Sequence, residues 1–111
     1  MNNQQIIAIA NQVFEDEIAG LQAVANTIDE AFCQAVQLIF NCTGKVIVSG
    51  MGKSGHIGNK IAATLASTGT AAFFMHPAEA LHGDLGMIES KDLLIAISYS
   101  GESDELSTII P

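Results

Sequence analysis

Two short, uninterrupted apolar runs constrain the fold of this sequence more than any other feature. The first, Val46–Val48, is β-branched throughout and leads into Ser49-Gly50, and the second, Leu93–Ile97, leads into Ser98. A strand that is apolar at successive positions is covered on both faces, as strands are in the middle of a parallel sheet. The sequence therefore predicts a buried parallel sheet whose strands end in small and hydroxyl-bearing residues.

The segments between these two runs predict crossover connections rather than hairpins. Ile57, Ile61 and Leu65 recur at every fourth position, which predicts a helix. The run at 71–75 predicts a further strand, which the proline at 77 ends. The order strand–helix–strand–strand, with a last helix beyond, is typical of a three-layer, doubly wound parallel α/β fold.

The strand at 93–97 needs a neighbour on each side if both its faces are covered, yet the 111-residue sequence ends soon after it. A sheet of three strands would leave a long apolar edge exposed. We therefore expect a sheet that is truncated after about three strands, in a sequence that is the front part of a larger domain.

The segment ahead of the first strand predicts two helices. Apolar residues recur there at helical spacing, at Ile7, Phe14, Ile18 and Leu21. Thr27 and Glu30 have the spacing of a capping box, which predicts the start of the second helix. We expect residues 1–44 to be a helical segment of the domain and residues 45–111 to be the sheet. The wide apolar faces predict packing against the domain's flank or a partner subunit, and hence a homo-oligomer.

Charge limits the ligands that the protein can bind. The net charge is −8, there is no arginine, and Lys45, Lys53 and Lys60 lie in a stretch at 45–75 without acidic residues. An acidic chain disfavours nucleic acid and anionic membrane surfaces as partners. A bound anion would be held by lysine, hydroxyl groups, backbone N–H groups or helix ends, and the middle third is where we expect it.

Nothing in the sequence predicts a membrane anchor or a secretion signal, because no apolar run approaches the roughly 18–20 residues of a spanning helix. The two cysteines, Cys33 and Cys42, are expected to be free and mostly buried thiols. Free thiols are typical of a reducing compartment, so a cytoplasmic protein is expected.

A glycine-rich turn follows the first strand. Gly50, Gly52 and Gly55 match the dinucleotide fingerprint, in which glycines let the backbone approach a phosphate at a helix N-terminus. The dinucleotide version also needs an acidic residue about 20 positions on, and the strand at 71–75 does not end in one. Lys53-Ser54 suits a single phosphate group better, and a solvated loop lysine is the alternative. No redox cofactor is expected.

A second turn, rich in hydroxyl groups, follows the last strand. Ser98, Ser100 and Ser103 lie within six residues around Gly101. Strand ends are where open α/β sheets bind ligands. Serine-glycine turns are common, so an anion cradle is predicted here only together with the glycine-rich turn at the end of another strand.

These motifs, taken in order, resemble the sugar isomerase (SIS) domain that binds phosphosugars. Three stretches, at 50–58, 82–87 and 100–103, are similar to those of the bacterial arabinose 5-phosphate isomerases of Kdo and capsule biosynthesis. Their letters are GMGKSGHIG, HGDLGM and SGES. The similarity runs from about Lys45 to Pro111, and the helical segment fits it more loosely.

The resemblance implies an aldose–ketose isomerase that interconverts D-ribulose 5-phosphate and D-arabinose 5-phosphate through an enediol, in lipopolysaccharide or capsule precursor synthesis. It assigns catalysis to Lys53 and Glu105. It assigns contact with the substrate to Gly52, Ser54, His82, Ser98, Ser100 and Ser103. His82 is also implied to capture inhibitory zinc, but no dedicated metal site is expected. From spacing alone, Glu105 fits a solvated acidic helix start equally well.

The sequence departs from the family in length. Full-length relatives continue through the rest of the sheet, which supplies another glutamate and histidine, and assemble as tetramers. We therefore expect this chain alone to be inactive. A phosphosugar-sensing SIS module without catalysis and a dinucleotide-dependent oxidoreductase remain the alternatives. His56 and His76 have no partner at ligand spacing, and a structural role is predicted for each.

Overall fold

The computed structural model of the chain describes residues 1–81 and 84–98. It divides into two compact units, Met1–Val36 and Gln37–Pro111, which are described separately. The predicted division at residue 44 between a helical segment and the sheet stays a prediction. In the described ranges, no helix is long and apolar enough to cross a membrane.

The first unit holds α1 (Asn3–Ala25), which begins with a capping box. Asn2 accepts a hydrogen bond from the Gln5 backbone at 2.9 Å, and the Gln5 side chain accepts one from the Asn2 backbone at 2.8 Å. No residue of α1 is buried. Its apolar stripe is therefore not covered within this unit.

The predicted capping box at Thr27 and Glu30 is wrong. The Thr27 hydroxyl instead donates to the Val24 carbonyl at 2.7 Å, in the turn that ends α1. The helix α2 (Glu30–Phe40) begins after Asp29, whose carboxylate accepts the Ala31 N–H at 3.0 Å. Aspartate competes well for an N-cap position, so the cap lies two residues later than the pattern at Thr27 predicted.

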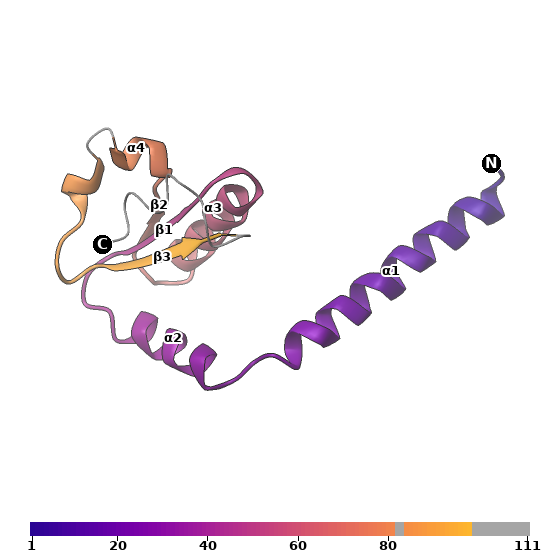
Figure 1. The fold of residues 1–111 in the computed structure, drawn as a ribbon, viewed down its shortest axis with the longest axis horizontal. Coiled ribbons are helices and arrows are strands. Elements are labelled where there is room, and N and C mark those ends of the chain that lie inside the picture. Colours follow the sequence, from indigo (N-terminus) through magenta and orange to yellow (C-terminus); the bar gives the residue numbers. More distant parts are fainter. Residues whose placement is uncertain (82–83, 99–111) are drawn as a thin grey trace. The chain divides into compact units, whose positions relative to one another are not determined.

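The second unit is built on a three-stranded parallel sheet, which confirms the predicted α/β class. The strands β1 (Val46–Gly50), β2 (Ala72–Phe74) and β3 (Leu93–Ile97) lie in the order β2-β1-β3 (Figure 1). Both β2 and β3 pair with β1 in parallel register, β2 through three residue pairs and β3 through five.

The middle of the described sheet is β1, and β3, for which the sequence predicted a neighbour on each side, pairs with β1 alone among the described strands. Every residue of β1 is buried, but Ala96 of β3 is exposed and the other four residues of β3 are half-buried. Both strands have the same uninterrupted apolar pattern, which predicts burial without telling which strand has neighbours on both sides. Within the described residues, β3 lies at an edge of the sheet.

Different segments cover the two faces of the sheet. The helix α3 (Gly52–Ser67) packs on one face, where Ala62 meets Val46 and Val48. On the other face Ile47 meets Met75 and Ile88. Two short turns, α4 (Pro77–Leu81) and η1 (Asp84–Met87), connect β2 to that second face.

Two glycines let α3 approach the sheet closely. A Cβ at Gly55 would lie 2.7 Å from the Gly50 carbonyl oxygen, closer than real Cβ contacts allow. A Cβ at Gly58 would lie 3.1 Å from Val48 Cγ1 and 3.2 Å from Phe74 Cε1. The glycine spacing in the turn is therefore a helix–sheet packing motif as well as a candidate ligand motif.

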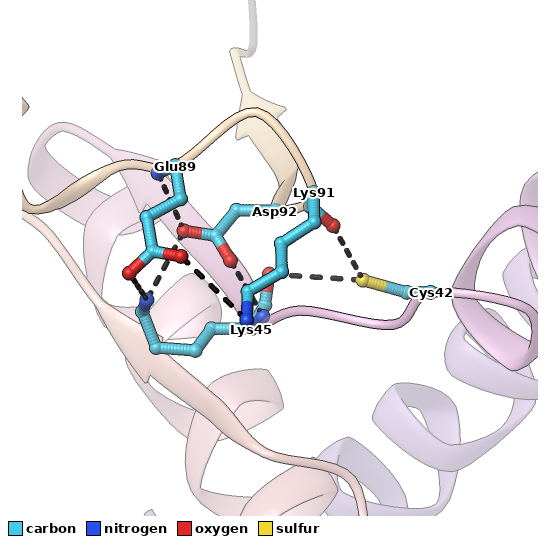
Figure 2. Close-up of polar contacts among 5 residues, drawn as sticks. All are labelled: Cys42, Lys45, Glu89, Lys91 and Asp92. Atoms are coloured by element: carbon cyan, nitrogen blue, oxygen red, sulfur yellow. Dashed lines mark hydrogen bonds and ion pairs between the residues drawn. The ribbon is translucent and has the colours of Figure 1, made fainter.

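A carboxylate joins the amino-terminal ends of β1 and β3. Asp92 accepts the backbone N–H of Lys45 at 2.7 Å and that of Glu89 at 2.8 Å, and it pairs with Lys45 Nζ at 3.1 Å (Figure 2). The N–H of Glu89, then that of Lys45, lowers the pKa of Asp92 to about 2. Gly44 is tightly packed beside this group, because a Cβ there would overlap the Asp92 carboxylate.

The cysteines are free, but they are less buried than predicted. Cys33 is exposed on α2, a helix with no buried residue. Cys42 is half-buried, and its thiol lies 3.6 Å from the Lys91 carbonyl and 3.8 Å from the Lys45 carbonyl (Figure 2).

Candidate functional site

The two predicted cradles begin at the carboxyl ends of two adjacent strands, β1 and β3. Because β1 and β3 are parallel and Gly50 pairs with Ile97, the turn after β1 and Ser98 after β3 follow adjacent strand ends. Crevices outside the carboxyl ends of neighbouring strands are the usual ligand sites of open α/β sheets. The sheet topology therefore brings together the two segments that the sequence singled out separately.

The turn after β1 leads directly into α3. Gly52 has a φ of 57°, a left-handed conformation that glycine adopts without a steric cost. Met51, the N-cap residue, is extended and provides no side-chain cap, and its carbonyl accepts the Gly55 N–H at 3.2 Å. The first-turn N–H groups of a helix have no intrahelical acceptor, so a helix start without a side-chain cap favours an anion.

Lys53 and Ser54 line a cavity of about 640 Å³ at this helix start, together with Met51 and Ile57. Lys53 is exposed and Ser54 is half-buried. In the part of the chain that the structure describes, Lys53 forms no ion pair, whereas Lys45 and Lys91 both pair with acidic side chains. A positive charge, a hydroxyl group and a helix N-terminus thus meet in one hollow, which suits a phosphate group.

Of the other predicted site residues, the structure describes only some. Ser98 is exposed directly after β3. His82, Ser100, Ser103 and Glu105 lie outside the described residues, so their predicted roles stay predictions. No group of three His, Cys, Asp or Glu that could hold a metal ion occurs among the residues that the structure covers.

A second cavity lies on α3, and no pattern in the sequence predicted it. It has a volume of about 380 Å³ and is lined by Gly52, Gly55, His56, Asn59, Phe74 and His76. His56 and His76 are 20 positions apart in the sequence, and they share a cavity only because α3 packs against β2. The one sequence signal is local, since His56 and Asn59 are three residues apart and lie on one helix face.

Known proteins with similar sequences agree with these motifs. The family model described as the SIS domain matches residues 38–111. Arabinose 5-phosphate isomerase GutQ of Escherichia coli K12 is 54% identical over 109 residues, covering 98% of this chain and 34% of the relative. Arabinose 5-phosphate isomerase KdsD of Yersinia pestis is 61% identical over 100 residues, covering 90% of this chain and 30% of the relative. The chain thus spans about a third of the length of these curated relatives.

Solved structures show the same fold over the whole chain. The c3406 protein of Escherichia coli CFT073, in complex with arabinose 5-phosphate, has a TM-score of 0.91 at 41% identity, covering 100% of this chain and 59% of that protein. A sugar-phosphate isomerase from Listeria monocytogenes has a TM-score of 0.91 at 34% identity, with the same coverage. The family model matches residues 38–111, and the fold and the glycine-rich turn after β1 agree with that match. This chain therefore belongs to the SIS domain family.

Proposed function

We propose that this chain is the phosphosugar-binding part of an isomerase that interconverts D-ribulose 5-phosphate and D-arabinose 5-phosphate. The observation that carries the proposal is the position of Lys53 beside Ser54 at the N-terminus of α3. This helix start has no side-chain cap, and Lys53 forms no ion pair among the described residues. It lies at the carboxyl end of β1, next to the strand end that Ser98 follows. Relatives named arabinose 5-phosphate isomerase are 54–62% identical to the chain. The arabinose 5-phosphate complex of a protein with the same fold supports the same class of substrate.

In this proposal the substrate phosphate binds at the start of α3. The Lys53 ammonium neutralises part of the phosphate charge, and the hydroxyl groups of Ser54, Ser98, Ser100 and Ser103 donate hydrogen bonds to its oxygens. Gly52 leaves room for a close approach of the backbone, since it has no side chain. The sugar then extends from the start of α3 toward the residues that follow β3.

The reaction itself needs only proton transfer. In the ribulose-to-arabinose direction a base removes a proton from C1, an enediol forms, and a proton returns to C2 while the oxygens exchange a proton. Glu105 is the proposed base, and Lys53 offsets negative charge on the substrate. His82 is proposed to lie near the sugar. The product would serve Kdo synthesis for lipopolysaccharide or capsule.

A homo-oligomeric, cytoplasmic protein is part of the same proposal. The row of exposed apolar side chains on α1, including Ile7, Phe14, Ile18 and Leu21, supports the oligomer. Contiguous exposed apolar surface of this kind marks interaction sites.

Two variants test the site. Lys53→Ala should weaken binding of arabinose 5-phosphate by about tenfold to a hundredfold, the scale of a lost hydrogen bond to a charged group. Lys60→Ala is the matched control, because Lys60 is also an exposed lysine of α3 and lines neither α3 cavity. Calorimetry with equal affinities for both variants would refute the phosphate assignment.

Glu105→Gln tests catalysis in the full-length protein. If Glu105 moves the proton, turnover should fall by about 10²–10⁴ while substrate binding persists. Unchanged turnover in a coupled assay would remove Glu105 from the mechanism. Binding without turnover in the unmodified full-length protein would favour a phosphosugar-sensing module instead.

A further inference from the structure

The second cavity on α3 has a lining of its own. At about 100° of rotation per residue, positions 52, 55, 56 and 59 form one stripe along the helix, and positions 53, 54 and 57 form a second stripe that adjoins the first where Lys53 and His56 are three residues apart. The first stripe lines the cavity of about 380 Å³ together with Phe74 and His76, and the second lines the Lys53 cavity. The two hollows thus have no described lining residue in common.

One hydrogen bond defines how His76 can bind a ligand. The backbone N–H of Ala78 donates to His76 Nδ1 at 3.1 Å. In the neutral imidazole one nitrogen accepts and the other carries the proton, so Nε2–H of His76 is a donor. A protonated Nε2 cannot ligate a metal ion. This arrangement favours a ligand with oxygen acceptors.

The remaining lining adds hydrogen-bonding groups of an imidazole and an amide. His56 and Asn59 are exposed, and within the described residues neither side chain bonds to the protein. An amide both donates and accepts hydrogen bonds, as does a neutral imidazole. Phe74 and the two glycines contribute apolar surface. A mostly apolar wall with a few polar groups is typical of a small-molecule site, and the volume is at the small end of that class.

Charge separates the ligands of the two cavities. The Lys53 cavity offers a cation to a phosphate, whereas this one is lined, among the described residues, by no lysine, no arginine and no carboxylate. The chain as a whole carries a net charge of −8, which repels anions from a site without lysine or arginine. An uncharged ligand with several hydroxyl groups matches the donors, the acceptors and the aromatic wall.

We propose that the cavity of His56, Asn59 and His76 is a second ligand site, which binds an uncharged sugar or polyol independently of the phosphosugar. Hydroxyl oxygens of the ligand accept from His76 Nε2–H and from the Asn59 amide, and ligand hydroxyl groups donate to the amide oxygen. The C–H face of the ligand lies against Phe74. This site goes beyond the proposed isomerase activity and does not depend on it.

Imidazole NMR spectra of the chain, titrated with D-arabinose, test the proposal. Saturable shifts of the His56 and His76 signals are expected, and inorganic phosphate should not compete with them. Asn59→Ala should weaken D-arabinose binding by about fivefold, the loss of one neutral hydrogen bond. Lys60→Ala, at the neighbouring exposed position, is the matched control and should leave the affinity unchanged.

Lys53→Ala separates this site from the phosphosugar site. The proposal expects this variant to keep D-arabinose binding while it loses phosphosugar affinity. Loss of D-arabinose binding in Lys53→Ala would assign the sugar to the Lys53 cavity and overturn the second site. The absence of saturable imidazole shifts in the parent chain would overturn it as well, whether or not any variant folds.

Discussion

Gly55→Ala tests the contact that places the glycine-rich turn. The added Cβ would lie 2.7 Å from the Gly50 carbonyl oxygen and 3.6 Å from Phe74 Cζ. The second distance is an ordinary contact, but the first is too short and involves backbone, which cannot rotate out of the way. The start of α3 and the end of β1 must therefore move apart by several tenths of an ångström.

The expected cost follows from two opposing effects. Overpacking a tight contact costs about 1–3 kcal/mol. Replacing glycine by alanine inside a helix returns about 0.5–1 kcal/mol. From the midpoints of these two ranges, the free energy of unfolding should fall by about 1 kcal/mol. Phosphosugar affinity should fall with it because Lys53 and Ser54 shift with the helix start.

Urea unfolding followed by circular dichroism measures the loss. Gly86→Ala is the matched control in the same unit, since it makes the same chemical change where a Cβ would meet nothing within 4 Å. The control should stay within about 0.5 kcal/mol of the parent. If Gly55→Ala is as stable as Gly86→Ala, the helix does not pack against Gly50 as described.

Two further predictions concern polar groups of the sheet. The pKa of Asp92 is lowered to about 2 from 3.8, so its carboxylate stabilises the fold fully above about pH 4, and this contribution is lost as the pH falls toward 2. Asp92→Asn should therefore be less stable than the parent at neutral pH and lose less stability on acidification, which urea midpoints across this pH range will show. The Ser49 hydroxyl is fully buried and, in the described part of the chain, has no hydrogen-bond partner. Ser49→Ala should raise the free energy of unfolding by about 1 kcal/mol, and a lower thermal midpoint would contradict this.

Local patterns in the sequence predicted the elements of the sheet well. The strands at 46–50 and 93–97, and the helix between the first two strands, appear where the apolar spacing indicated. The predicted strand at 71–75 is shorter in the structure, at 72–74. Buried β-branched runs and four-residue apolar spacing depend on residues close in the sequence, which is why the strands and the helix could be predicted.

Contacts between residues far apart in the sequence could not be predicted in the same way. The Asp92 carboxylate bonds to the backbone of a residue 47 positions away. Nothing in the local sequence distinguishes it from a solvated acid in a turn. The order β2-β1-β3 likewise depends on which strand pairs with which, and two equally apolar strands give the same pattern at the centre and at the edge.

The same limit explains why the His56 cavity was missed and the Lys53 turn was found. Lys53 and Ser54 follow a glycine-rich strand end, so three neighbouring features in the sequence already describe an anion site. His56 and His76 come together only because β2 lies beside β1 under α3, and Gly55 and Gly58 let that helix approach the sheet. The glycines that look like a phosphate motif thus have a second effect: they bring α3 close enough to the sheet for Phe74 and His76 to line a cavity together with His56 and Asn59. A substitution that lifts α3, such as Gly55→Ala, should therefore disturb both cavities, whereas Lys53→Ala should disturb only one.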